Sequence, residues 1–216
     1  MSTNIPREEN YDLVFQILFC KFAKIVKTFE NMKNILVIVD AQNDFIDGAL
    51  GSEEAKSRIA NISNKIESFT DGVIITTQDT HQENYLETKE GKALPIAHCI
   101  QYSRGWGINV EVATSIIAKA SMDQSVSYDS VSKPTFGSTE LMEKIASYVG
   151  NEEFNITFVG FCTDICVISN ALLTKAAFYE KANVYVDASC CAGVTPEKHN
   201  AALEVMKSCQ IIVENE

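Results

Sequence analysis

The chain has 216 residues and a formal net charge of −11, with 46% hydrophobic and 22% charged residues. This length and composition are ordinary for one globular domain with a sizeable core. The excess of acidic residues argues against binding to nucleic acid or to anionic membranes, because both require basic surfaces. The seven cysteines are irregularly spaced and follow no secretory signal, so we expect reduced thiols in the cytoplasm rather than a disulfide framework.

Residues 1–31 give the weakest structural signal. The run Leu13–Val26 is apolar, but it contains two lysines and lacks a small-residue cleavage site, and it is too short to span a bilayer. We interpret it as a short amphipathic helix rather than as a membrane or signal segment. Residues 1–31 are therefore predicted to be an N-terminal extension, and Met32 opens a domain over residues 32–216.

From Asn34 onward, short apolar runs alternate with helical patterns. The predicted strands are Ile35–Val39, Val73–Thr77, Val126–Ser132, Ile156–Val159, Val184–Asp187 and Ile211–Val213. The predicted helices are Glu53–Phe69, Thr114–Ala120, Thr139–Val149, a helix that carries Cys166, and Pro196–Ser208. Such alternation predicts an α/β three-layer sandwich of Rossmann-like type, in which a mostly parallel six-stranded sheet is covered on both faces. The long irregular stretch from Gln78 to Asn109 is predicted to be a functional loop.

The run Phe154–Leu173 contains the most informative cysteine. Its strand ends at Gly160, and Thr163 and Asp164 are both favourable residues for a helix start. Cys166 is therefore expected in the first turn of a helix, where unpaired N–H groups and the helix dipole stabilise a thiolate and lower its pKa. Because cysteine is also a common core residue, Cys166 alone does not define a site.

Two further reactive side chains are predicted at the same edge of the sheet. Asp40 follows the first strand and Lys133 follows the third, and ligands of open α/β sheets bind where strands end. A carboxylate that accepts the thiol proton and an ammonium that favours the thiolate would activate Cys166 as a nucleophile. Taken singly, Asp40 has an explanation as a turn cap and Lys133 as a solvated side chain. Only their joint placement indicates catalysis.

A second cluster of polar residues lies in the predicted loop. Asp79 and His81 flank one residue, His98 follows, and the loop thus holds two of the three histidines. Two imidazoles and a carboxylate suit Zn²⁺, and Fe²⁺ or Mn²⁺ fits the same donors, with Glu90 as a candidate fourth ligand. A hydrogen-bonded structural pair explains Asp79 and His81 almost as well. We interpret His199 as a structural residue of an exposed helix.

Five motifs, in order, resemble those of the isochorismatase-like cysteine hydrolases, and among these the nicotinamidase branch in particular. They are VDAQNDF (Val39–Phe45), QDTH (Gln78–His81), LPIAHC (Leu94–Cys99), SKPTFGS around Lys133, and GFCTDICV (Gly160–Val167). The resemblance extends from about Lys33 to the C-terminus. Five motifs in order are far more specific than any one of them.

The resemblance implies a catalytic triad of Asp40, Lys133 and Cys166. It also implies that the Asp-His-His cluster of the loop binds a divalent metal, with zinc the first choice. A non-proline cis peptide is implied at Phe161–Cys162, and the N–H groups of Cys162 and Cys166 are implied to form an oxyanion hole.

The resemblance further implies a pocket for a flat heteroaromatic substrate. Phe45 and Phe136 match positions that often line the ring pocket in this family, and Trp106 is a third candidate. Ordinary packing is the alternative for each, and it explains Trp106 equally well. The chain departs from the family pattern at Leu94, where tryptophan is frequent, and at Cys162, which replaces an alanine.

The reaction implied is hydrolysis of nicotinamide to nicotinate and ammonia through a cysteine thioester, a cytoplasmic step of NAD salvage. We expect a small-molecule amide as partner and neither nucleic acid nor membrane, and a homo-oligomer is compatible with the sequence. One alternative is another amidohydrolase of the superfamily, with or without metal, that acts on a carbamoyl, ureido or other small amide. A second alternative is a non-enzymatic thiol or zinc-binding protein that uses Cys162, Cys166, Cys190 and Cys191. The absence of a C-x-x-C pair argues against it.

Overall fold

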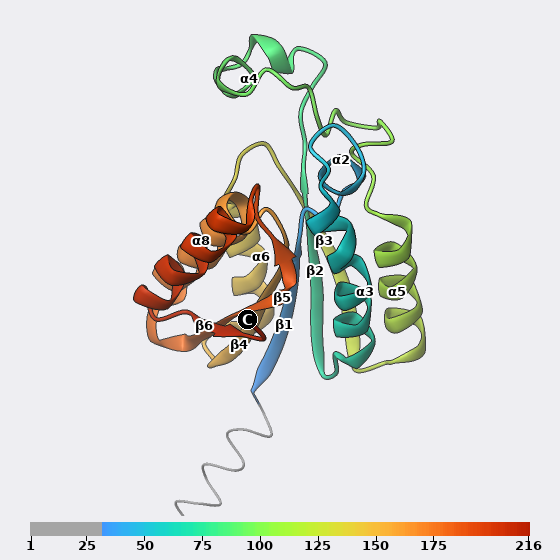
Figure 1. Cartoon of the computed structure of the whole chain (residues 1–216). Helices are drawn as coiled ribbons and strands as arrows, with labels where there is room; N and C mark the ends of the chain where they lie inside the picture. Colours follow the sequence, from blue (N-terminus) through green and yellow to red (C-terminus); the bar gives the residue numbers. More distant parts are fainter. Residues whose placement is uncertain (1–31) are drawn as a thin grey trace, which may run out of the picture. The chain divides into compact units, whose positions relative to one another are not determined.

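A computed structural model describes residues 32–216. The predicted extension over residues 1–31, with its Leu13–Val26 helix, lies outside the described residues. Six strands form one sheet in the order β3-β2-β1-β4-β5-β6, and every neighbouring pair is parallel (Figure 1). The strands are β1 (Lys33–Val39), β2 (Gly72–Asp79), β3 (Val126–Lys133), β4 (Phe154–Phe161), β5 (Ala182–Ala192) and β6 (Ile212–Glu214). The predicted six-stranded α/β architecture is confirmed.

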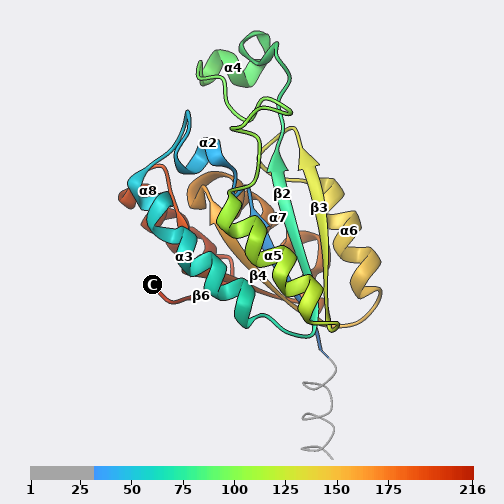
Figure 2. The ribbon, with the colours of Figure 1, turned by 90° about the vertical axis from the view of Figure 1, so that its right-hand side faces the viewer.

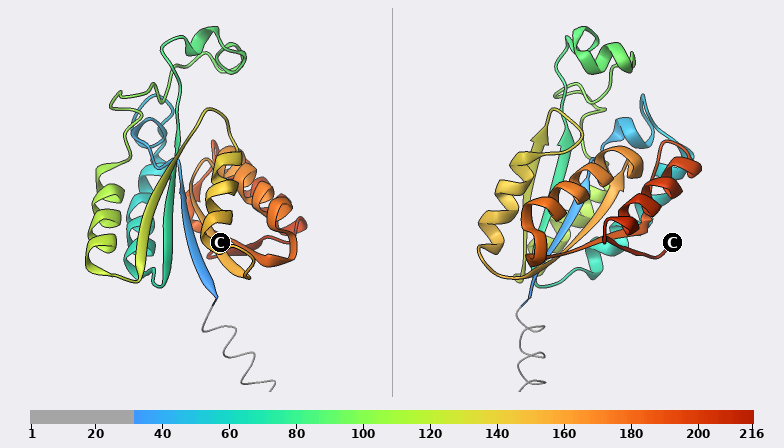
Figure 3. Two further views of the ribbon diagram at one scale, coloured as in Figure 1. Left: turned by 180° about the vertical axis from the view of Figure 1, so that it is seen from behind. Right: turned by 90° about the vertical axis from the view of Figure 1, so that its left-hand side faces the viewer.

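Helices cover both faces of the sheet, as Figures 1 and 3 show. One face carries α3 (Glu53–Ser68) and α5 (Val110–Met122), and the other carries α6 (Thr139–Val149), α7 (Ile168–Phe178) and α8 (Pro196–Ser208). The helix expected over Thr114–Ala120 begins earlier, at Val110. Asn109 caps this start, because its side chain accepts a hydrogen bond from the Glu111 N–H.

The stretch from Gln78 to Asn109 is less irregular than the sequence suggested. Strand β2 continues to Asp79, and the 3-10 turn η1 (Tyr85–Glu87) and the short helix α4 (Lys89–Ala93) follow it. Figure 2 shows α4 beyond the end of the sheet, apart from the two helical layers. Elements this short span too few residues to display a helical period, which is why the sequence pattern missed them. The other short elements are α2 (Asn43–Ile46), η2 (Thr163–Val167), a π-helical turn, and η3 (Tyr179–Lys181).

The central strands are buried on both faces, as their continuous apolar sequences predicted. In β1, Val37 packs with the side of the sheet that carries α6 to α8, whereas Leu36 and Ile38 pack with the side that carries α3 and α5. All three side chains are fully buried, and burial of each contributes about 1.5–3 kcal/mol. This two-sided core fixes the strand ends, where the polar residues gather.

Strand β4 approaches β1 unusually closely at Gly160. Its φ angle is 114°, and a Cβ atom there would overlap the carbonyl oxygen of Val39. Only glycine fits this conformation and this contact. The chain then passes through a cis peptide at Phe161–Cys162, as the resemblance implied. No helix within residues 32–216 is both long and apolar enough to cross a bilayer.

Candidate active site

The three predicted triad residues meet at one edge of the sheet. Asp40 follows β1 directly, Lys133 is the last residue of β3, and Cys166 lies in η2 just after β4. Lys133 Nζ is 2.7 Å from Asp40 Oδ2 and 3.4 Å from Cys166 Sγ. The three residues are 0%, 1% and 4% exposed, respectively. The predicted convergence is therefore observed, and the catalytic role of each residue stays a prediction.

Asp40 is held in an environment suited to a general base. Its backbone has a φ angle of 46°, a left-handed conformation that is uncommon for a non-glycine residue. Thr77 Oγ1 donates a hydrogen bond of 2.7 Å to Asp40 Oδ1. Among the described residues, Asp40 Oδ2 accepts no well-aligned hydrogen bond, although Lys133 lies close to it. Burial raises the pKa of Asp40, and Lys133 offsets part of that rise. This oxygen can therefore accept a proton.

The ionisation of Cys166 differs from the expectation. Burial raises the pKa of this thiol well above its usual range, Asp40 and Asp79 raise it further, and Lys133 opposes them. The lowered pKa expected from the helix start is therefore not found. That argument left out burial, whereas this thiol is only 4% exposed and lies near two carboxylates.

Asp79, His81 and His98 form a compact and buried group. One donor atom from each lies within 4.8 Å of the others. Asp79 Oδ2 is 3.1 Å from His81 Nε2 and 3.4 Å from His98 Nε2. His98 Nδ1 lies 2.8 Å from the Ile96 carbonyl oxygen, to which it can donate, and this contact directs Nε2 towards Asp79. The donor set and its burial fit a divalent metal ion such as zinc.

Glu90, the candidate fourth ligand, lies at the margin of this group. Its Oε1 atom is 3.6 Å from His81 Nε2, and its side chain is 22% exposed. Glu90 belongs to α4 and is not part of the compact three-residue group. Its ligation stays a prediction.

The sequence did not reveal the role of Gln42 in supporting the site. This buried side chain accepts a 2.7 Å hydrogen bond from the Asp79 N–H and donates one of 2.8 Å to the Asp79 carbonyl. Gln42 thereby ties the end of β2 to the residues after β1. Its position inside the VDAQNDF motif was the only signal that could have indicated such a role.

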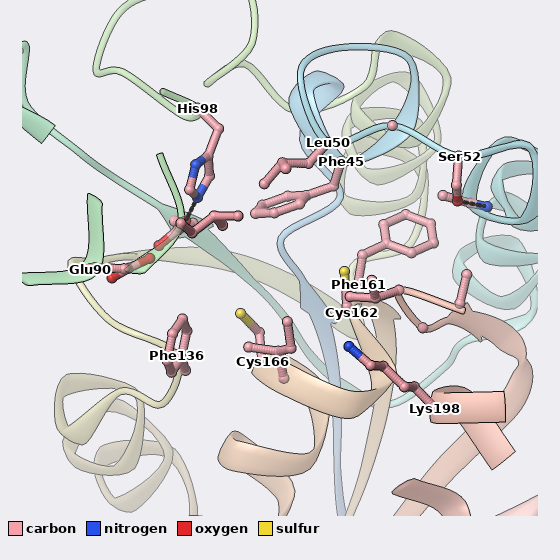
Figure 4. Close-up of a pocket in the computed structure, with 18 residues that line it drawn as sticks. Phe45, Leu50, Ser52, Glu90, His98, Phe136, Phe161, Cys162, Cys166 and Lys198 are labelled. Atoms are coloured by element: carbon pink, nitrogen blue, oxygen red, sulfur yellow. Dashed lines mark hydrogen bonds and ion pairs between the residues drawn. The ribbon is translucent and has the colours of Figure 1, made fainter. Parts of the chain in front are cut away.

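A cavity of about 440 Å³ opens onto the thiol (Figure 4). Phe45 and Phe136, the two expected aromatic residues, both line it, and so does Leu94. We call Asp79, His81 and His98 the metal-type group. The cavity also reaches Asp79 and His98, so Cys166 and the metal-type group share one space. The remaining lining residues are Leu50, Gly51, Ser52, Ala55, Glu90, Phe161, Cys162, Ile165, Cys166, Ala192, Gly193, Val194 and Lys198.

The structure places two further residues that the sequence singled out. Trp106 is not among the residues that line the cavity, and its indole N–H donates a 2.9 Å hydrogen bond to Thr80 Oγ1. His199 is half-buried rather than exposed, and its Nδ1 lies 2.8 Å from Thr163 Oγ1, at the start of η2. Its structural role is thus to support the turn that carries Cys166.

The cysteines do not form a metal site in the described part of the chain. Among residues 32–216 the metal-type group contains only Asp79, His81 and His98. Cys190 and Cys191 are buried in β5, and burial raises the pKa of the Cys162 thiol to about 12. The placement of these thiols gives no support to the thiol or zinc-module alternative.

The fold and the site together define the class of this protein as an α/β hydrolase. The isochorismatase domain family matches residues 34–216, and the chain belongs to this family. A comparison with curated proteins gives no match.

Several solved structures share this fold. A pyrazinamidase of Pyrococcus horikoshii in complex with zinc is 26% identical, with a TM-score of 0.65 over 84% of this chain and 98% of that one. A nicotinamidase/pyrazinamidase from Bacillus subtilis is 23% identical, with a TM-score of 0.69 over 84% and 99%. PnC1 from L. infantum in complex with nicotinate is 20% identical, with a TM-score of 0.66 over 84% and 92%.

Proposed function

We propose that this chain is a nicotinamidase, which hydrolyses nicotinamide to nicotinate and ammonia. The observation that carries the proposal is a single cavity that joins Cys166 to Asp79 and His98 between Phe45 and Phe136. A flat heteroaromatic ring fits between aromatic walls. The names of the structural relatives, pyrazinamidase and nicotinamidase, and the nicotinate held by one of them support the same substrate class.

In the proposed reaction Asp40 Oδ2 accepts the proton of Cys166, and the thiolate attacks the amide carbon. Lys133 stays protonated, because burial, which lowers its pKa, is outweighed by the carboxylates of Asp40 and Asp79, and the pKa lies above the usual range. The N–H groups of Cys162 and Cys166 stabilise the oxyanion. Protonated Asp40 then gives its proton to the departing ammonia, and water cleaves the thioester to release nicotinate.

The Asp79–His81–His98 group is proposed to orient the ring. A divalent ion bound by these three residues would supply a positive charge that attracts the ring nitrogen. Phe45 packs edge-on against His98, with ring centroids 5.7 Å apart. One aromatic wall is therefore held against the metal-type group, so the ring and the amide can be oriented together.

Ammonia release tests the proposal. The wild-type protein should release ammonia from nicotinamide, and Cys166→Ala should lower kcat by more than about 10⁴-fold. Cys209→Ala, which removes an exposed thiol remote from the cavity, is the matched control and should keep full activity. Undiminished ammonia release from Cys166→Ala would disprove the mechanism. Hydrolysis of a carbamoyl or ureido compound with none of nicotinamide would favour the other amidohydrolases of the family.

We also propose that residues 1–31 are an extension to the hydrolase domain and that the reaction serves NAD salvage in the cytoplasm. The start of the family match at residue 34 supports the boundary. A chain that begins at Met32 should keep its ammonia release. Loss of folding or activity in that truncated chain would show that residues 1–31 belong to the domain.

A further inference from the structure

One basic side chain faces the cavity from the side opposite the metal-type group. Lys198 projects from α8, and Figure 4 shows it extending towards Cys162 and Cys166, with His98 and Glu90 on the other side of Cys166. Among the described residues that line the cavity, Lys198 is the only lysine or arginine. Of the two acidic lining residues, Glu90 lies on the other side of Cys166 in Figure 4, and Asp79 contacts His98.

Lys198 is exposed, and neither an ion pair among the described residues nor helix stability holds it at this position. None of the ion pairs among residues 32–216 includes it, whereas Lys207 on the same helix pairs with Glu204 and Glu216 at 2.8 and 2.6 Å. Lys198 occupies the third position of α8, after the cap Thr195. A cation in the first turn is disfavoured by the helix dipole, and a glutamate there would complete a capping box.

On the basis of the proposed amide hydrolysis, we propose that Lys198 makes this end of the cavity a carboxylate-binding site. Hydrolysis converts a neutral amide into an acid, so a carboxylate forms at Cys166, the residue towards which Lys198 extends. A substrate that already carries a carboxylate would present the same charged group to Lys198. In either case Lys198 selects for a negative charge beside the thiol, and an ammonium–carboxylate contact supplies the affinity.

Direct binding to the full chain tests the site without requiring turnover. In a Cys166→Ala background, calorimetry compares nicotinate with nicotinamide, a matched acid and amide. Lys198→Met should lower the ratio of nicotinate affinity to nicotinamide affinity about tenfold, the usual value of one charge-assisted hydrogen bond. Lys207→Met, on the same helix but outside the cavity, should leave the ratio unchanged. An unchanged ratio in Lys198→Met, or the same change in both variants, would overturn the proposal.

Kinetic assays with the active enzyme distinguish a carboxylate of the reaction product from one that the substrate carries. If the reaction product is the ligand, Lys198→Met should raise the inhibition constant of nicotinate about tenfold. If the substrate carries the acid, Lys198→Met should instead lower kcat/KM for a carboxylate-bearing ring amide about tenfold relative to its neutral analogue. If Lys198→Met produces neither of these two effects, the proposed carboxylate site is contradicted. Absence of ammonia release from nicotinamide, with a binding ratio that still depends on Lys198, would reject the proposed reaction and retain the carboxylate site.

Discussion

Lys133 Nζ lies 2.7 Å from Asp40 Oδ2, although strand β2 separates their strands, β3 and β1, in the sheet. The same ammonium is 3.5 Å from Asp79 Oδ1, at the end of β2. Lys133 therefore balances two buried carboxylates and connects the nucleophile with the metal-type group. Removal of one charge from such a buried set leaves the others uncompensated.

We expect Lys133→Met to lower the free energy of unfolding by about 3–5 kcal/mol, because it leaves Asp40 and Asp79 without their buried cation. Adding Asp40→Asn should recover part of that loss, since one of the unpaired charges is then removed. Urea unfolding of the wild type, both single variants and the double variant measures the coupling. Strictly additive losses would show that the 2.7 Å contact carries no coupling.

Metal binding should depend on His98 and not on His199. We expect the purified wild-type protein to contain a divalent ion, and His98→Ala to weaken its binding by more than about 100-fold through loss of a buried imidazole donor. Elemental analysis and metal titration, with circular dichroism as a check on folding, give the answer. His199→Gln is the matched control and should keep its metal, since His199 contacts Thr163 instead. Equal metal content in both variants would exclude the proposed ligands.

Substitutions at the two aromatic residues Phe136 and Trp106 should have different effects on KM for nicotinamide. Phe136 lines the cavity, so Phe136→Ala should raise KM for nicotinamide about three- to tenfold through lost ring contact. Trp106 binds Thr80 outside the cavity, so Trp106→Phe should leave KM within about twofold. Steady-state ammonia release over a range of nicotinamide concentrations measures both. A larger effect from Trp106→Phe than from Phe136→Ala would contradict the placement of the cavity.

Asp187 should make stability depend on pH. Burial tends to raise the pKa of its carboxyl, but hydrogen bonds from Lys65, Ser189 and Asn215 outweigh burial and hold it below the usual range. A lowered native pKa stabilises the fold above the unfolded value of about 3.9 and loses that effect as pH falls through the native value. Because the Lys65 side chain is 28% exposed, Asp187→Asn should lower the free energy of unfolding by only about 1–2 kcal/mol at pH 7.

Urea unfolding of wild type and Asp187→Asn between pH 7 and pH 3 measures this dependence. The difference in the free energy of unfolding between the two proteins should shrink below about pH 4. Protonation of Asp187 in the wild type then removes the same charge that Asp187→Asn removes. A difference that stays constant over the whole range would mean that packing, rather than ionisation, accounts for the loss.

Much of the fold could be read from local patterns. Continuous apolar runs such as Ile35–Val39 predicted buried parallel strands, and the helical pattern of Thr139–Val149 predicted α6 with its observed bounds. Short turns were missed because η1 and α4 are each too brief to show a period. The start of α5 was placed too late, since a single Asn109 cap is a weak signal.

The site was predictable where position along a strand fixes position in space. Asp40, Asp79 and Lys133 each end a strand or follow one, and the ends of parallel strands meet at one edge. Loop residues have no such rule. The direction of Trp106, the half-buried state of His199 and the approach of Lys198 to the cavity all depend on packing between distant segments.

The sequence by itself determined the α/β architecture, the polar strand ends and the family, because hydrophobic period and motif order are local properties. Tertiary structure alone decided the direction in which the pKa of Cys166 is shifted and the cation that faces the cavity. Ionisation depends on burial and on charges from other strands, and the neighbours of a side chain exist only after the chain has folded.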